Sequence, residues 1–398
     1  MKRFKRIFII VADSLGIGAL EDAELYNDVG ANTFKHLSYA KKDFSIPTLE
    51  EMGVGHLTDI NNTPPVTKPL ASFGKMKEIS VGKDTLTGHW ELMGLHVKKS
   101  FPVFTENGFP RELIEKLENA TGHRFIGNYA ASGTEIIKEL GEEHLKTKHL
   151  IIYTSTDSVL QIAANEAIVP LEELYRVCTI ARNLTLKEPG WTVGRIIARP
   201  FIGTNKDNFV RTANRHDYAI KPFDKTALDF LKDENFAVIA VGKINDIFVG
   251  EGITETIKTK SNQHGMSEFI QLAKRNFTGL AFINLVDFDA VYGHRRNALG
   301  YALAVEEFDC DLTEFINFVN NDDLLIICAD HGNDPIHHGT DHTREYIPLL
   351  VYNPSLFGKN LGTRNTFADI GATVSDNFRT KMPKIGISFL QEIQKERN

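Results

Sequence analysis

Six short runs of apolar residues, each ending in polar or charged residues, constrain the fold of this 398-residue chain more than any other feature. The runs are IFIIVAD at 7–13, HLIIYTSTD at 149–157, FAVIAVGK at 236–243, LAFINLVDFD at 280–289, DLLIICADHGND at 323–334 and IPLLVYN at 347–353. Their apolar residues are continuous rather than alternating, which is typical of strands covered on both faces. Helical patterns at 267–277 and 302–319 lie between them. This alternation predicts an α/β fold with a largely parallel sheet flanked by helices.

The region 101–218 differs from the rest of the chain. It has its own turns and its own apolar run at 149–154, but it lacks the other runs' Asp-rich strand ends. The whole chain also exceeds the ~100–200 residues of one ordinary domain. We therefore expect a core domain formed by 1–100 and 219–398, interrupted by a smaller inserted α/β domain at 101–218.

The composition excludes several classes of protein. With 45 Lys and Arg against 52 Asp and Glu, the formal net charge is −7, so the chain has no general field that would attract nucleic acid. A small phosphorylated substrate needs only a local basic pocket and stays possible. No run reaches the ~20 apolar residues of a membrane span or the ~7–15 of a secretory signal. The three scattered cysteines indicate a reducing cytoplasm, and nothing indicates an obligate protein partner.

Histidine and aspartate are concentrated between residues 294 and 342 and at nearby strand ends. The cluster comprises His294, His331, His337, His338, His342, Asp287, Asp289, Asp330, Asp334 and Asp341. Ligands of α/β proteins bind at the carboxyl ends of the strands, and these side chains are the donors that a divalent cation requires. A carboxylate and an imidazole at the end of a buried strand are also too costly to be accidental.

Six of these candidates, from four separate loops, form the predicted ligand set. They are Asp13, Asp289, His294, Asp330, His331 and His342. Six ligands are too many for one catalytic ion and suit two ions with three protein ligands each. Mixed carboxylate and imidazole ligands favour manganese, with zinc, iron and magnesium as alternatives. Spacing alone does not separate Asp287 from Asp289, and we interpret His337 and His338 as residues of a solvated loop.

The segment VGKDTLTGHWELMG at 81–94 contains a candidate nucleophile. A turn at Gly82 and Lys83 precedes a helical pattern that begins at Thr85 or Thr87. A hydroxyl at a helix N-terminus faces free backbone N–H groups and the positive end of the helix dipole. Such a threonine is either a simple N-cap or a nucleophile that bound metal ions activate. The residue types alone do not decide between an N-cap and a nucleophile, nor between Thr85 and Thr87.

Four segments carry a family resemblance: VADSLGIGA at 11–19, GKDTLTGHWELMG at 82–94, DFDAVYGHRR at 287–296 and ADHGNDPIHHGTDHTREYIPLL at 329–350. Over essentially its whole length the chain resembles the bacterial phosphopentomutases of the alkaline phosphatase superfamily. The GKDT…GHWE block is specific to that family and its closest relatives, whereas ADHG indicates only the superfamily. Cofactor-independent phosphoglycerate mutases are related but lack this block.

The resemblance implies a role for each candidate. Thr85 would be the nucleophile, which carries a phosphoryl group in the active enzyme. One manganese ion would be held by Asp13, Asp330 and His331, the other by Asp289, His294 and His342, with Thr85 or its phosphate between them. The chain has Ile336 where the family loop reads DPT, and the neighbouring imidazole leaves the role of His338 open.

The resemblance further implies that the inserted domain is a cap that holds a sugar phosphate. Ser155 and Asp157 would contact ribose hydroxyls, and Arg195, Arg211 and Lys243 the distal phosphate. The implied reaction interconverts ribose (or 2-deoxyribose) 1-phosphate and 5-phosphate through a bisphosphate, with glucose 1,6-bisphosphate or a similar sugar bisphosphate as activator. The alternatives are a metal-dependent phosphatase or phosphodiesterase, which would pass the phosphoryl group to water, and a non-catalytic sugar-phosphate-binding protein.

Overall fold

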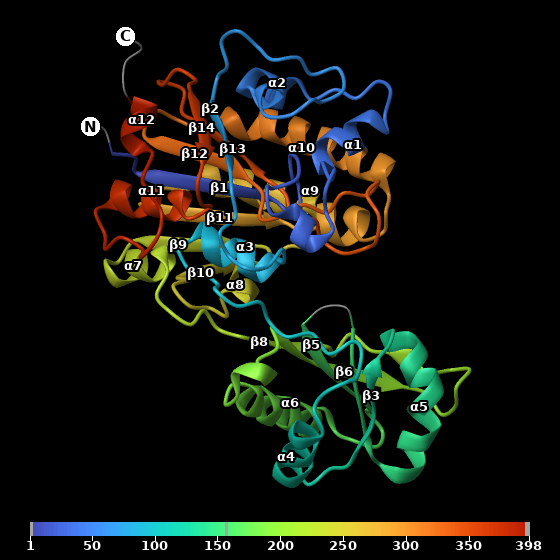
Figure 1. Cartoon of the computed structure of the whole chain (residues 1–398). Helices are drawn as coiled ribbons and strands as arrows, with labels where there is room; N and C mark the ends of the chain where they lie inside the picture. Colours follow the sequence, from blue (N-terminus) through green and yellow to red (C-terminus); the bar gives the residue numbers. More distant parts are fainter. Residues whose placement is uncertain (1–2, 156–157, 395–398) are drawn as a thin grey trace. The chain divides into compact units, whose positions relative to one another are not determined.

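The computed structural model describes residues 3–155 and 158–394, and the chain forms two compact α/β units (Figure 1). The first unit comprises Met1–Lys99 and Lys221–Asn398, and the second comprises Ser100–Ile220. Within the described ranges, no helix combines the length and the apolar character needed to cross a membrane.

The first unit is built on an eight-stranded sheet. Its order is β10 (Glu255–Ile257), β9 (Ala237–Val241), β11 (Gly279–Leu285), β1 (Arg6–Ala12), β12 (Asp323–Cys328), β13 (Ile347–Tyr352), β2 (Ser72–Met76) and β14 (Asn360–Arg364). The five strands from β10 to β12 are parallel, whereas β13 is antiparallel to both of its neighbours. The predicted strands of this unit are therefore confirmed, and the sheet is parallel where the site residues follow.

The central strand β1 determines where those residues emerge. Each of its residues is buried, and it pairs in parallel with β11 on one side and β12 on the other. The register sets Ala12 opposite Leu285 and Val11 opposite Cys328, so the three carboxyl ends lie at one edge of the sheet. The residues after these strands are consequently brought together, as parallel topology requires.

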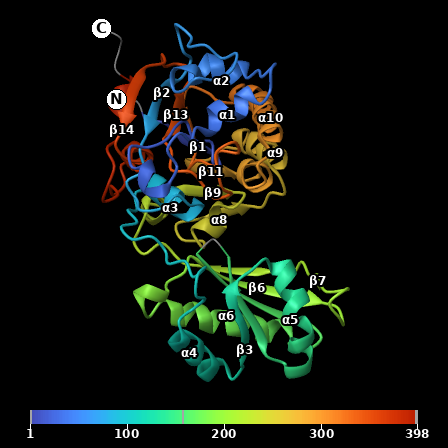
Figure 2. The ribbon, with the colours of Figure 1, turned by 45° about the vertical axis from the view of Figure 1, so that its right-hand side comes forward.

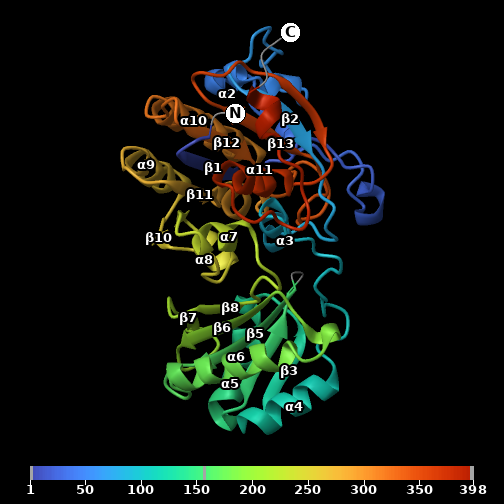
Figure 3. The same cartoon turned by 90° about the vertical axis from the view of Figure 1, so that its left-hand side faces the viewer.

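Helices cover both faces of this sheet (Figure 3). They are α1 (Thr33–Tyr39), α2 (Pro47–Met52), α3 (Thr85–Leu92), α7 (Ala227–Asp233), α8 (Ile244–Ile247), α9 (Asn262–Ala273), α10 (Ala298–Ile316), α11 (Asp369–Phe378) and α12 (Leu390–Gln394). Helices α9 and α10 pack together in one layer, and α3 and α11 pack together in the other. The predicted helical patterns correspond to α9 and α10, although α9 ends at Ala273, before the Lys-Arg-Asn-Phe of 274–277 that the pattern included.

The second unit has a mixed sheet with helices on both faces (Figure 2). Its elements are α4 (Arg111–Thr121), β3 (Phe125–Ala130), α5 (Gly133–Thr147), β4 (Leu150–Thr154), β5 (Val159–Asn165), α6 (Leu171–Thr185), β6 (Arg195–Ile202), β7 (Val210–Arg211) and β8 (His216–Ala219). Alternate residues of β4 face opposite sides: Leu150 and Ile152 pack with α4 and α6, whereas Ile151 and Tyr153 pack with α5. This alternation is the ordinary period of a strand between two apolar layers.

Candidate active site

The loops after β1 and β12 supply two buried carboxylates to the carboxyl edge of the first unit's sheet. Asp13 follows β1 directly and is 2% exposed, and Asp330 follows β12 and is fully buried. Ser14 has a positive φ of 66°, an uncommon conformation for a residue other than glycine. Its backbone N–H donates to Asp330 Oδ1 at 3.0 Å. The sharp turn after β1 thus fixes one carboxylate relative to the other.

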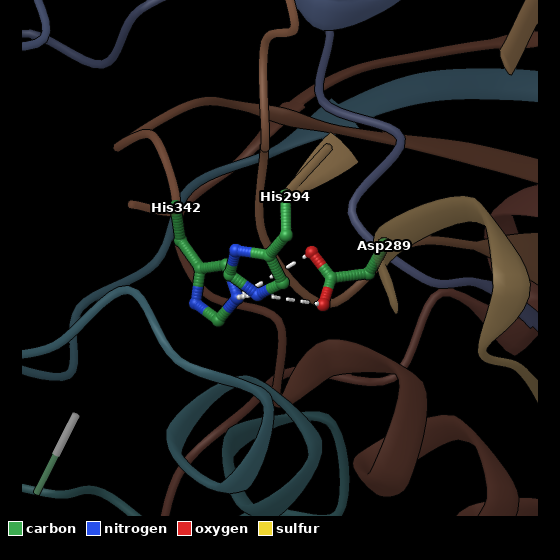
Figure 4. Close-up of side chains that lie close together, drawn as sticks. All are labelled: Asp289, His294 and His342. Carbon is green, nitrogen blue, oxygen red and sulfur yellow. Dashed lines mark hydrogen bonds and ion pairs between the residues drawn. The ribbon is translucent and has the colours of Figure 1, made fainter. Parts of the chain in front are cut away.

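A second group of donors forms where β11 runs into a π-helical segment, Phe288–Gly293. Such segments are rare and frequently occur at functional sites. Asp289 Oδ2 lies 3.1 Å from His294 Nε2, and Asp289 Oδ1 lies 3.4 Å from His342 Nε2 (Figure 4). The two imidazole Nε2 atoms are 3.1 Å apart. Ligand atoms of all three residues lie within 4.8 Å of one another, which is the spacing of a metal site.

His331 joins the two groups. Its Nε2 lies 3.5 Å from Asp13 Oδ1 and 3.3 Å from Asp330 Oδ2, and its ring stacks on that of His342 with 4.0 Å between centroids. A second set of mutually close donors consists of Asp13, Asp289 and His331. The structure therefore brings the six residues of the predicted ligand set into one cluster, in which Asp289 lies near both groups.

The electrostatics of the cluster fit divalent cations. Asp13 Oδ1 and Asp330 Oδ2 are buried and accept no hydrogen bond within the described part of the chain. Burial, reinforced by the charges of Asp330 and Asp289, raises the pKa of Asp13 well above its usual value. Burial alone would also raise the pKa of Asp289, but His342 and His294 outweigh it and lower that pKa. Carboxylates buried this close together require positive charge, which the donor set is suited to bind as metal ions.

The two candidate nucleophiles differ in what their hydroxyls contact. Thr85 Oγ1 lies 3.2 Å from His331 Nε2. Thr87 is buried, and its Oγ1 donates to Asp84 Oδ2 at 2.6 Å. The N-cap of α3 is Asp84, which accepts from the N–H groups of Leu86 and Thr87. The reading of a threonine as the N-cap is therefore wrong, because a carboxylate already satisfies these first-turn donors.

His89 is a site residue that the sequence reasoning missed. It is fully buried one turn after Thr85, and its Nδ1 lies 2.9 Å from the carbonyl oxygen of Thr85 and 3.1 Å from Asp330 Oδ2. Asn333 was missed as well, and its Nδ2 donates to Asp289 Oδ1 at 2.7 Å. Both belong to the segments that carried the resemblance. A helical projection of 85–92 would have placed His89 on the face of Thr85.

Three nearby candidates lie apart from the donor cluster. Asp287 Oδ2 accepts from the N–H of Asn262 at the start of α9, at 2.8 Å. His337 and His338 contact each other with ring centroids 4.2 Å apart, and His338 is exposed. Neither histidine belongs to the two donor groups found among the described residues.

Arg344 connects the histidine-rich loop to the segment that precedes Thr85. Its side chain is 3% exposed, and its guanidinium donates to Glu78 Oε2 at 2.6 Å and to the carbonyl oxygens of Ser80 and Gly82 at 2.9 and 2.6 Å. Lys83 Nζ lies 3.0 Å from Asp28 Oδ2. These contacts hold 78–83 in place immediately before α3.

The residues implied for substrate binding are distributed over both units. Arg195 begins β6 in the second unit, with Nη1 3.9 Å from Asp217, and Arg211 lies in β7 opposite Phe201. Ser155 follows β4, whereas Asp157 lies outside the described residues. Lys243 belongs to the first unit, at the N-cap of α8, and Gly242 separates it from the end of β9.

Comparisons with known proteins place the chain in a family. A model described as the metalloenzyme superfamily matches residues 5–382. Phosphopentomutases from Clostridium perfringens strains 13 and SM101 are each 56% identical to the chain over 396 residues, covering 99% of it and 100% of each relative.

Two solved structures share the fold. The PH0037 protein of Pyrococcus horikoshii has a TM-score of 0.50 and 14% identity, and the alignment covers 97% of this chain and 100% of that one. Leishmania mexicana phosphoglycerate mutase has a TM-score of 0.50 and 12% identity, with 98% and 97% covered. The structural likeness supports the α/β architecture, and the sequence identity confirms the resemblance: the chain belongs to the phosphopentomutase family of metalloenzymes and is a mutase, an isomerase that transfers a phosphoryl group.

Proposed function

We propose that the chain interconverts ribose 1-phosphate and ribose 5-phosphate, and the corresponding 2-deoxyribose phosphates, through phosphorylated Thr85. The observation that carries this proposal is the hydroxyl of Thr85 in the first turn of α3, 3.2 Å from His331 Nε2 and beside the buried carboxylate cluster. Thr87 is the weaker candidate, since its hydroxyl is already engaged by Asp84.

The proposed reaction has two symmetric halves. In the first, the bond between Thr85 Oγ1 and phosphorus breaks as the free hydroxyl of the sugar monophosphate forms a new oxygen–phosphorus bond, giving a 1,5-bisphosphate. In the second, Thr85 Oγ1 attacks the other phosphoryl group, which regenerates phosphothreonine and releases the isomer. After accidental hydrolysis of the phosphothreonine, a sugar bisphosphate such as glucose 1,6-bisphosphate would transfer a phosphoryl group to Thr85 Oγ1 and leave as the monophosphate.

The chain's own residues position this chemistry. Asp13, Asp330 and His331 would hold one divalent ion, and Asp289, His294 and His342 the other. Two such ions, which we expect to be manganese, would neutralise the phosphoryl oxygens and favour ionisation of the attacking hydroxyl. Asp84 fixes the first turn of α3, and His89 contacts both the carbonyl of Thr85 and Asp330. His89 thus ties the nucleophile to one of the proposed ligands, Asp330.

The second unit is proposed as the cap that holds the sugar phosphate. Ser155 and Asp157 would bind ribose hydroxyls, and Arg195, Arg211 and Lys243 would bind the distal phosphate. This assignment is supported by the cationic character of β6 and β7 and by the family to which the chain belongs. The scattered cysteines, among them the buried Cys178 and Cys328, support a reducing cytoplasm as its location.

The test compares Thr85→Val with Thr85→Ser in the manganese-loaded enzyme. Valine keeps the shape of threonine without the hydroxyl, whereas serine keeps the hydroxyl. We expect mutase activity on ribose 5-phosphate to be abolished by valine and partly retained by serine, with metal content unchanged in both. Intact-mass measurement should find one phosphoryl group on the native enzyme and none on the valine variant. Full activity of Thr85→Val would refute the proposal.

The same assay separates the mutase from a phosphatase. A phosphatase with these ligands would pass the phosphoryl group to water, so inorganic phosphate would appear in step with consumption of ribose 5-phosphate. A mutase yields ribose 1-phosphate with little release of phosphate. A non-catalytic binding protein would form neither product and no phosphothreonine.

A further inference from the structure

A pocket of about 530 Å³ lies within the second unit, beside the N-terminal part of α5 and the strands β6 and β7. Its lining includes Thr134, Arg199, Phe209, Arg211, Thr212 and Arg215. The volume is ample for a sugar phosphate. The three arginines give the pocket a strongly cationic lining.

Strand geometry explains how these arginines meet. Arg199 alternates in β6 with Ala198, which packs under α6, so its side chain is on the face that carries α5. Strand β7 is antiparallel to β6, and its Arg211 lies opposite Phe201 of β6. Arg215 comes just before β8, which is likewise antiparallel to β6. Residues that are up to sixteen positions apart in sequence are thereby brought to one surface.

The positive charge of this cluster is incompletely balanced. Arg215 pairs with Asp217 at 2.7 Å, and Arg199 Nε donates to the neutral amide of Gln161 at 2.9 Å. Over the described residues, neither Arg199 nor Arg211 forms an ion pair. Burial, together with the charges of Arg215 and Arg211, lowers the pKa of Arg199. An anion in the pocket would relieve this repulsion and would occupy the free N–H donors of two guanidinium groups.

A buried hydroxyl points to the same ligand. Tyr153 is fully buried, and its hydroxyl has no hydrogen-bond partner among the described residues. A Cβ built on Gly133, the first residue of α5, would lie 2.7 Å from this hydroxyl and 3.2 Å from Arg211 Nη1. The hydroxyl is therefore adjacent to both the arginine cluster and the N-terminus of a 15-residue helix, a place where anions are stabilised. An unpaired buried hydroxyl is costly unless a ligand satisfies it.

We propose that this pocket binds the phosphate group of a phosphate monoester through Arg199, Arg211 and Arg215, with the hydroxyl of Tyr153 as a further donor. Arg211 was already expected to contact the distal phosphate, whereas Arg199, Arg215 and Tyr153 are new. The ligand is either the non-reacting phosphate of the sugar phosphate or a separate phosphate ligand. The first choice rests on the proposed function, but phosphate binding itself does not.

Protection from phenylglyoxal tests the proposal directly on the native, manganese-loaded enzyme. This reagent modifies arginine side chains, and peptide mass spectrometry measures the rate at each position. Ribose 5-phosphate or inorganic phosphate is expected to slow modification of Arg199, Arg211 and Arg215 about fivefold or more, since bound guanidinium groups are shielded. Arg111, which is 92% exposed on α4, is the control and should react at an unchanged rate. Equal rates with and without ligand at the three pocket arginines would overturn the proposal.

Kinetics then distinguish the two sources of phosphate. If the substrate's non-reacting phosphate binds here, Arg199→Gln should raise KM for ribose 5-phosphate about tenfold or more, because it removes charge-assisted hydrogen bonds. Tyr153→Phe should raise KM about threefold without loss of stability, because the lost hydroxyl has no hydrogen-bond partner among the described residues. Arg111→Gln should leave KM unchanged. Protection by phosphate with unchanged KM in both pocket variants would instead identify a separate phosphate site.

Measuring arginine protection and mutase activity separately distinguishes a failure of this proposal from a failure of the proposed function. Arginine protection requires no turnover, so it can be measured on Thr85→Val. For the native enzyme, protection of the three arginines without any mutase activity would support the pocket and refute the mutase, and mutase activity without protection would do the opposite.

Discussion

Replacing Arg344 by Met is expected to destabilise the first unit by about 3 to 5 kcal/mol, the cost of breaking a buried ion pair by removing one partner. Both side chains of the Arg344–Glu78 pair are nearly inaccessible, at 3% and 2% exposed. Burial raises the pKa of Glu78 well above its usual value even though the charge of Arg344 opposes this. Without the guanidinium, the buried Glu78 carboxyl group and the buried carbonyl oxygen of Ser80 would both lose a hydrogen-bond donor.

A double-mutant cycle separates the pair from its surroundings. Replacing both Arg344 and Glu78 by apolar residues removes the unpaired charge, so the double variant should be more stable than the sum of the single losses predicts, by about 2 kcal/mol. Arg275→Met is the matched control. Arg275 forms two hydrogen bonds to Glu255, at 2.7 and 2.8 Å, but the side chains are 47% and 39% exposed. Solvent screening should hold the cost of this variant below about 1 kcal/mol.

The two tryptophans provide the assay. Trp90 is buried in the first unit and Trp191 lies in the second, so a Trp191→Phe background leaves fluorescence that reports on the first unit alone. Urea unfolding of the manganese-loaded protein followed at Trp90 then gives the change in the free energy of unfolding. A loss below about 1 kcal/mol for Arg344→Met, equal to the exposed control, would refute the argument from burial.

Three further outcomes follow from the structure. Gly88→Ala should lower mutase activity and stability, by about 1 to 3 kcal/mol, because a Cβ would lie 2.1 Å from the carbonyl oxygen of Asp330; Gly190→Ala, which meets nothing within 4 Å, is the control in activity and melting assays. Burial raises the pKa of Glu345 from 4.5 to about 7. Between pH 4.5 and about pH 7, the carboxyl group is therefore protonated in the folded state and ionised in the unfolded state. Stability should therefore fall by about 3 kcal/mol as pH rises through this window, and a pH series of urea titrations should lack that component in Glu345→Gln. Chelation of divalent ions should lower the melting temperature of the native enzyme, since it uncovers the buried carboxylates of Asp13, Asp289 and Asp330, and an unchanged melting temperature would contradict the metal assignment.

Sequence patterns predicted the centre of the sheet better than its edge. The runs that form β1, β11 and β12 are continuous and apolar because helices cover both faces of the sheet. Such runs can be identified as strands from the sequence alone. By contrast, β2 reads SFGKM and β14 reads NLGTR, and neither is a run of apolar residues. Strand β2 forms because its backbone pairs with β13, and β14 forms because its backbone pairs with β2. At this edge of the sheet, tertiary pairing therefore outweighs local strand propensity.

The candidate site shows the same division at the level of single residues. Strand ends indicated the six predicted metal ligands, because parallel strands deliver their carboxyl ends to one edge, but spacing alone did not separate Asp289 from Asp287. Spacing left Thr85 and Thr87 equivalent, and their difference arises from Asp84, whose carboxylate engages the hydroxyl of Thr87. Arg199 and Arg215 carried no sequence signal, because their proximity depends on the pairing of β6 with β7 and β8.

Each unit gathers charge of one sign that its own residues leave incompletely balanced, buried in the first unit and around a partly exposed pocket in the second. In the first unit, Asp13, Asp289 and Asp330 lie together, and oxygens of two of them accept no hydrogen bond within the described residues. In the second, Arg199, Arg211 and Arg215 share one pocket with Asp217 as the neighbouring carboxylate. Such arrangements are unfavourable in an empty protein and become favourable when ligands of opposite charge bind. A phosphate ester together with divalent cations supplies both kinds of charge, so a chain with a formal net charge of −7 can bind an anionic substrate through local fields alone.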